Sequence, residues 1–106
     1  MHTNEIHWHD SRIQRVIELP AADKLLLDID YPVDWATSRF EPHRVTFSDV
    51  YVYQIHEGPI AGAPTLLSAE EEPAENETRN IRLDTTAGHR LIRCRQITIH
   101  PLDENG

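Results

Sequence analysis

The first ten residues contain the densest group of side chains that could bind a metal ion. His7 and His9 are two positions apart, and Asp10 follows directly. Side chains two positions apart project from the same face of a strand. Both imidazoles could therefore hold zinc or nickel, with Asp10 as a third ligand or as an orienting partner. The alternative is the start of a strand, in which Asp10 or Ser11 bonds nearby backbone amides. Apart from this metal hypothesis, the sequence predicts no cofactor.

Nucleophilic catalysis has less support in the sequence. Cys94 occupies a position expected to face the interior of a sheet, where a cysteine behaves as a small apolar side chain. No serine lies in a G-x-S-x-G motif, and the G-x-G-x-x-G and G-x-x-x-x-G-K-[ST] phosphate-binding loops are absent. We therefore predict no catalytic residues and expect a protein that is not an enzyme.

Two tyrosines are candidates for binding a partner. If the valines on either side of Tyr51 face the core, strand alternation sends Tyr51 and Tyr53 to the other face. An outward pair of aromatic side chains is either covered by another element or exposed as a binding surface. The covering element could be another strand or the loop expected over residues 32–42, whose aromatic side chains include Trp35 and Phe40.

These side chains must be positioned mainly by strands. In the segment 24–31, Leu25, Leu27 and Ile29 alternate with other residues, which predicts a strand with one buried face. Gly88 is the expected residue at positive φ in a hairpin turn. Strands are also predicted over 12–19, 79–85 and 89–100, with tight turns at 20–23 and 86–88.

The segment 65–72 is ambiguous. Thr65 could cap a short helix. In a strand, Leu67 and Ala69 would face inward instead. We favour the strand, because the surrounding elements are strands.

Two later segments share an unusual spacing of apolar residues. In each, the gaps between successive apolar positions are two, three and two residues. Strict alternation would send half of each set to the wrong face. One extra residue in the strand restores the phase, so we predict β-bulges near Ser48–Asp49 and Arg95–Gln96. The two sets are Val45, Phe47, Val50, Val52 and Ile92, Cys94, Ile97, Ile99.

The elements together predict an all-β fold in a single domain over residues 1–106. We expect six to seven antiparallel strands, bulged, arranged as a sandwich or a partly open barrel. The alternative is a β-rich α+β fold with one short helix at 34–38 or 65–71. An unpaired edge strand would allow self-association, so the expected state is a monomer or a homodimer.

Charge and composition narrow the classes of partner. The 106 residues carry 18 Asp and Glu against 10 Lys and Arg, a formal net charge of −8. Such a chain should repel phosphate backbones, so we expect no nucleic-acid binding and favour a basic protein partner. The single cysteine, the absence of a basic-then-apolar N-terminal run and the absence of a long apolar stretch predict a cytoplasmic protein that does not bind membranes.

Three short motifs carry a family resemblance. They are Trp8-His9-Asp10-Ser11, the run E-G-P-I-x-G-x-P-T-L-L over residues 57–67, and T-A-G-H-R over residues 86–90, followed by Cys94. This combination resembles small bacterial β-rich proteins similar to the immunity proteins that accompany polymorphic toxins. The resemblance implies no catalytic residues, and it favours a strand over residues 64–72. It also implies a binding role, in which an acidic domain blocks a basic toxin surface.

The leading expectation is therefore a non-enzymatic binding module with a basic protein partner, and the resemblance implies the immunity type. Two alternatives stay open. One is a small metal-dependent protein that uses His7, His9 and Asp10. The other is a β-barrel that binds a small molecule in an apolar lumen.

Overall fold

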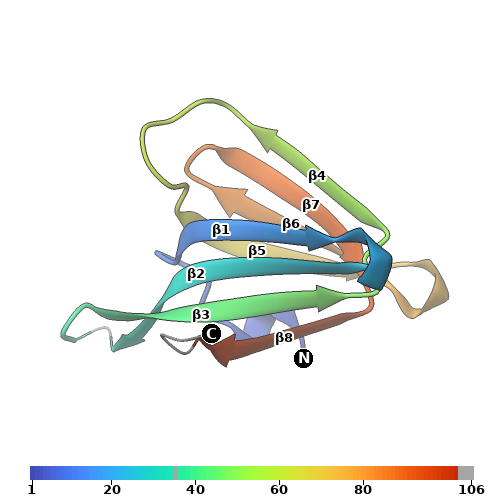
Figure 1. Cartoon of the computed structure of the whole chain (residues 1–106), viewed down its shortest axis with the longest axis horizontal. Helices are drawn as coiled ribbons and strands as arrows, with labels where there is room; N and C mark the ends of the chain where they lie inside the picture. Colours follow the sequence, from blue (N-terminus) through green and yellow to red (C-terminus); the bar gives the residue numbers. More distant parts are fainter. Residues whose placement is uncertain (35, 103–106) are drawn as a thin grey trace.

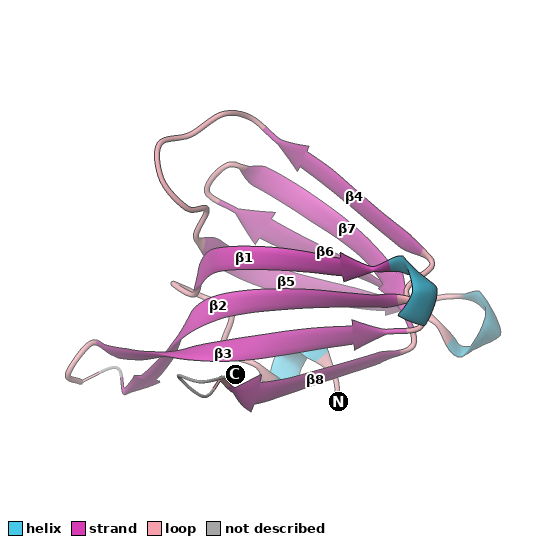
Figure 2. Cartoon of the chain, in the orientation of Figure 1, coloured by secondary structure: helices cyan, strands magenta, loops and turns pink. Residues whose placement is uncertain are grey.

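Most of the chain is extended, in a computed structural model that describes residues 1–34 and 36–102. Those residues form eight strands in two antiparallel four-stranded sheets (Figures 1 and 2). Sheet A has the order β1 (Arg12–Leu19), β2 (Lys24–Asp34), β3 (Arg39–Ser48), β8 (Gln96–Pro101). Sheet B has the order β4 (Val52–Glu57), β7 (Gly88–Cys94), β6 (Arg79–Thr85), β5 (Leu66–Pro73). Three short 3-10 helices are η1 (Thr3–Glu5), η2 (Pro20–Ala22) and η3 (Glu75–Glu77).

The two sheets bury one shared apolar core. Side chains alternate across each strand, and the inward ones from both sheets meet between them. Leu25, Leu27 and Ile29 on β2 are buried, which confirms the period-two prediction for this strand. The all-β fold is confirmed, and its strands form two separate sheets that do not close into a barrel. Further core residues are Ile13, Val45, Phe47, Leu66, Ile81, Leu83, Ile92, Cys94 and Ile97.

The repeated spacing marks two corners between the sheets. Residues 49–51 carry the chain from β3 in sheet A to β4 in sheet B, and Arg95 carries it from β7 to β8. The corners lie side by side, because the Arg95 N–H donates to the Ser48 carbonyl at 3.1 Å. The predicted bulges at Ser48–Asp49 and Arg95–Gln96 are therefore wrong. The predicted change of phase holds at the second corner, where buried Ile92 and Cys94 are followed by buried Ile97. At the first corner Val50 packs against the core, but the inward position predicted for Val52 is wrong, because Val52 is exposed and Tyr53 faces inward. Each long strand is divided at its corner, so the described chain has eight strands rather than six or seven.

The bulges lie elsewhere in the sandwich. The register shifts between Ile13 and Arg15, between Pro32 and Asp34, and between Leu66 and Ser68. The last shift places Leu66 in the core and leaves Leu67 exposed, so the inward position predicted for Leu67 is wrong.

The two segments that could have been helical do not give a helix in the described residues. Residues 66–73 form β5, as favoured from the sequence. The strands β2 and β3 extend into a hairpin, so residues 32–42 are mainly strand rather than loop. Phe40 in this hairpin is 41% exposed, while Trp35 lies outside the described residues. No helix among the described residues is long and apolar enough to cross a membrane.

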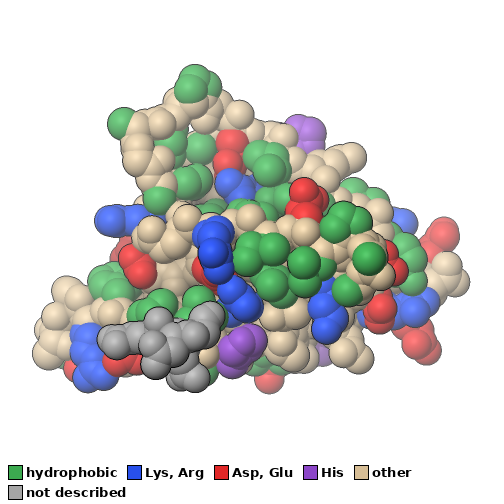
Figure 3. All heavy atoms as spheres, in the orientation of Figure 1, with side chains coloured by type: hydrophobic (Ala, Val, Ile, Leu, Met, Phe, Trp, Pro, Cys, Tyr) green, Lys and Arg blue, Asp and Glu red, His purple; other side chains and the backbone are tan. Residues whose placement is uncertain are grey.

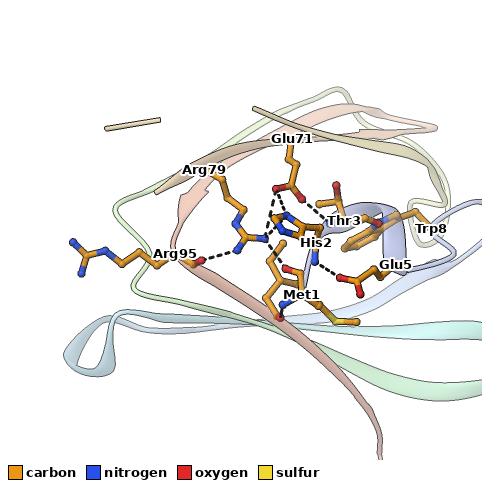
Figure 4. Close-up of polar contacts among 9 residues, drawn as sticks. Met1, His2, Thr3, Glu5, Trp8, Glu71, Arg79 and Arg95 are labelled. Atoms are coloured by element: carbon orange, nitrogen blue, oxygen red, sulfur yellow. Dashed lines mark hydrogen bonds and ion pairs between the residues drawn. The ribbon is translucent and has the colours of Figure 1, made fainter. Parts of the chain in front are cut away.

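The N-terminal segment closes one side of the sandwich, between β8 and β5 (Figure 4). The amino group of Met1 donates to the Ile97 carbonyl on β8 at 3.3 Å. Thr3 N–H donates to Glu71 Oε1 on β5 at 2.6 Å, and His2 Nδ1 lies 2.9 Å from Glu71 Oε2. Behind this polar rim, Trp8 is buried and donates its indole N–H to the Thr3 carbonyl at 2.8 Å.

Glu71 on β5 holds this N-terminal segment, residues 1–8, which we call the N-terminal plug. Burial alone would raise the pKa of the Glu71 carboxyl, but hydrogen bonds from His2 and Thr3 and the nearby Arg79 guanidinium outweigh it and lower that pKa. Arg79 also donates to the Arg95 carbonyl at 2.9 Å, which ties the plug to the corner. The side of the sandwich between β5 and β8 is therefore sealed by the chain itself.

Candidate binding surface

The predicted metal ligands lie in the connection between η1 and β1, not on a strand. The premise that His7 and His9 share a strand face is therefore wrong. His9 Nε2 lies 3.4 Å from Asp10 Oδ1, while His9 Nδ1 lies 3.2 Å from the Leu67 carbonyl oxygen. His7 is exposed, and its backbone N–H donates to the Tyr31 hydroxyl at 3.0 Å. The structure thus brings His9 and Asp10 together.

Within residues 1–34 and 36–102, no three His, Cys, Asp or Glu side chains are grouped as a metal site would need. The metal hypothesis for His7, His9 and Asp10 stays a prediction. Metal analysis of protein purified without a histidine tag tests it directly.

The two candidate tyrosines have different surroundings. Tyr53 is half-buried on the inner face of sheet B, and its hydroxyl accepts a hydrogen bond from Arg90 Nη1 at 3.0 Å. Burial raises the pKa of this hydroxyl. Tyr51 lies at the corner and is 58% exposed, with the Arg95 guanidinium carbon 5.6 Å from its ring centroid. The two tyrosines therefore do not form one outward stripe, because Val52 rather than Tyr53 faces outward.

Arg90 is held by a polar network inside sheet B. It is 7% exposed, and its Nη2 and Nε donate to Glu57 Oε1 and Oε2 at 2.7 and 2.8 Å. Thr85 Oγ1 donates to the same carboxylate at 2.9 Å. The hydrogen bonds from Arg90 are the largest cause of the lowered pKa of Glu57. This bidentate pair fixes the end of β4 against β7.

The outer face of sheet B is hollowed. Cross-strand pairing places Gln54, Leu91, Arg82 and Glu70 in one row across the sheet. A second row beside it consists of Val52, Arg93, Asn80 and Glu72. A depression of about 610 Å³ lies over these rows. Two glutamates stand at the β5 side and two apolar side chains at the β4 and β7 side. The outward side chains of the depression are Val52, Gln54, Glu70, Glu72, Asn80, Arg82, Leu91 and Arg93.

A third row on this outer face is polar. The Ser68 hydroxyl donates to Asp84 Oδ2 at 3.2 Å, and Arg82 Nε donates to Asp84 Oδ1 at 2.9 Å. The bond from Arg82 is the largest cause of the lowered pKa of Asp84. The rings of His56 and His89 stack at 4.8 Å between centroids. Because Ser68 bonds the carboxylate rather than an imidazole, this row lacks the serine–histidine contact of a hydrolase triad.

The side of the sandwich between β4 and β1 is open. In the described residues, the ladder partner of β4 is β7 alone. Ile55 belongs to the inward set of β4, yet it is 53% exposed, because sheet A does not extend beneath it. Figure 3 shows hydrophobic side chains along the upper rim, where β4 and the following loop lie. The exposed apolar residues of this rim are Tyr51, Val52, Ile55 and Ile60.

Sequence reasoning missed both the hollowed face and the open side. Glu70 and Glu72 are two positions apart, as are Leu91 and Arg93, and residues at this spacing share one face of a strand. This spacing could have marked them as outward positions. The order of the strands was needed to place these positions in one surface. In sequence comparisons, no family model and no curated protein matches this chain.

Proposed function

We propose that this chain is a non-enzymatic protein-binding module whose binding surface is the hollowed outer face of sheet B. The observation that carries the proposal is the depression of about 610 Å³, to which all four strands of the sheet contribute side chains. Such a surface resembles a protein interface in combining apolar side chains with charged and polar ones. The proposal includes a cytoplasmic site of action, which the single buried thiol of Cys94 favours.

The proposed partner is a basic protein. The chain carries a net charge of −8, and Glu70 and Glu72 stand at one rim of the depression. A basic partner would be steered towards the chain by its overall negative charge and held at the depression by Glu70, Glu72 and the apolar side chain of Leu91, while Arg82 is already paired with Asp84. The resemblance to immunity proteins supports a toxin as that partner, with its active surface blocked on binding.

The surface can be tested by reversing its rim charges. The probe is the product of the adjacent gene, co-expressed with this chain and recovered by pull-down. We expect capture by the wild-type chain, and loss of most of that capture in the double variant Glu70→Lys/Glu72→Lys. Both side chains are exposed, so the fold should survive, which circular dichroism checks.

A matched control has the same change in net charge. The double variant Glu18→Lys/Glu75→Lys changes two exposed glutamates outside the depression. It should retain capture, because the loss depends on the surface and not on total charge. If the wild-type chain captures nothing while folded, or if both double variants lose capture equally, the proposed surface is wrong.

A further inference from the structure

The edges of the two sheets are protected to different degrees. Exposed strand edges template pairing with other chains, and charges, prolines and bulges guard against it. On β5, residues 70–72 are three glutamates and Pro73 follows. On β8, the amino group of Met1 bonds the Ile97 carbonyl, and the strand ends at Pro101. On β1, the register shifts after Ile13, and the start of the strand bridges to Thr65.

The edge of β4 is less guarded, because its one charged residue, Glu57, is bound to Arg90 on the inner face of the sheet. Residues 52–56 contain no Asp, Glu, Lys, Arg or Pro. The strand pairs with β7 in unbroken register from Val52 to Glu57. Beyond it, the described chain places no further strand in sheet B (Figure 1).

The free backbone groups of β4 belong to alternate residues. The Gly58 N–H donates to the Ala87 carbonyl at 3.0 Å, which fixes the phase of the ladder. In an antiparallel ladder, successive residues direct their N–H and C=O groups to opposite sides. Even-numbered residues of β4 therefore bond towards β7, and Tyr53, Ile55 and Glu57 present their backbone groups to the free side.

We propose that β4 pairs antiparallel with β4 of a second copy of this chain, with Ile55 opposite Ile55 of the partner subunit. This register uses all three free residues, since Tyr53 then lies opposite Glu57 of the partner subunit. A shift in one direction would bring Pro59, which has no N–H, opposite Tyr53. A shift in the other direction would bring the corner residue Tyr51 opposite Glu57.

The side chains of β4 are complementary to themselves in this register. On the inner face, the two Ile55 side chains meet, and each is 53% exposed in the single chain. On the outer face, Gln54 lies opposite His56 of the partner subunit, which allows a hydrogen bond. No like charges face each other, because the glutamates meet tyrosines. A second copy thus fits this edge despite the net charge of −8.

The two-fold axis of this pairing is perpendicular to the joined sheet. Both outer faces of sheet B then lie on the same side of one continuous sheet. The dimer would present two copies of the hollowed surface side by side. The pairing itself needs no external partner and stands independently of the proposed function.

The test measures the molar mass of the full chain in solution across a range of concentrations. The wild-type chain should be a concentration-dependent dimer. Ile55→Lys and Ile55→Glu should each weaken dimerisation by about tenfold or more, because like charges then lie directly opposite. An equimolar mixture of the two variants should recover the dimer, since only the register with Ile55 opposite itself pairs lysine with glutamate.

The control is Leu67→Lys, which places the same charge at a 42% exposed apolar position on the β5 edge. This variant should dimerise as the wild-type chain does. A wild-type chain that stays monomeric, a dimer that survives Ile55→Lys, or a mixture that does not recover the dimer would overturn the proposal. The variant Glu70→Lys/Glu72→Lys should keep the dimer, so a failure of the binding proposal is separable from a failure of this one.

Discussion

The Arg90 guanidinium carries a full positive charge in an otherwise apolar layer. Its hydrogen-bond partners offset the cost of removing this charge from water. Glu57 binds it through two hydrogen bonds, and the Tyr53 hydroxyl accepts a third. Among the described residues, no buried side-chain nitrogen or oxygen lacks a hydrogen-bond partner. A buried charge is costly when its partner is removed, because the remaining ion has neither water nor a counter-charge.

Glu57→Gln should therefore destabilise the fold far more than the loss of a surface ion pair. The amide keeps the shape of the carboxylate but leaves the Arg90 guanidinium without a counter-charge, so the free energy of unfolding should fall by about 3 kcal/mol. Urea denaturation measures this. The control is Asp84→Asn, which breaks a more exposed pair with Arg82 and should cost about 0.5 kcal/mol. Equal losses in both variants would contradict this account of Arg90.

At the scale of elements, the sequence pattern located strands better than it located their partners. The alternation over residues 24–31 and 79–85 depends on which face is buried, and strands form there; a strand also forms over residues 12–19, where β-branched content rather than alternation favoured it. The apolar spacing also revealed the change of phase after Cys94. It could not distinguish a bulge from a corner, because that depends on whether the next residues pair in the same sheet. Such pairing joins segments far apart in sequence, such as β4 and β7.

The same limit applies to the candidate surface. The alternation around Tyr53 fixes two sets of residues, but it does not say which set faces inward. The structure turns Tyr53 inward because Arg90, 37 positions later, lies beside it on β7. The hollowed face likewise combines residues from four strands, and neither the strand order nor the twist of the sheet is encoded in a local pattern.

Gly88 is the element-scale test of how β4 is held. Its φ is +151°, as the turn prediction required, and a Cβ built there would lie 2.1 Å from the His56 carbonyl oxygen on β4. Gly88→Ala should push β4 away from β7 and lower the free energy of unfolding by about 2 kcal/mol. Amide exchange of β4 should accelerate more than that of β2. Gly58→Ala is the control, since no atom lies within 4 Å of its added Cβ, and it should change neither measurement.

Across the whole molecule, stability is coupled to carboxylates that hold separate parts of the sandwich together. On the outer face of sheet A, Asp28 accepts hydrogen bonds from Arg44 at 2.7 Å and Arg15 at 3.2 Å, which join β1, β2 and β3. The bond from Arg44 is the largest cause of the lowered pKa of Asp28. Glu57 and Glu71, with lowered pKa values of their own, hold β4 and the N-terminal plug.

Acid should therefore destabilise the whole fold. Because the pKa values of Asp28, Glu57 and Glu71 are lower in the folded chain than their ordinary values of 3.8 and 4.5, the unfolded chain binds more protons below about pH 5. Their contribution to stability is fully present above the ordinary values and is lost as pH falls through the folded ones. Urea denaturation between pH 7 and pH 3 should show a decreasing free energy of unfolding, with a smaller decrease in Asp28→Asn. A free energy that stays constant or rises on acidification would mean that these carboxylates do not link the sheets as the structure indicates.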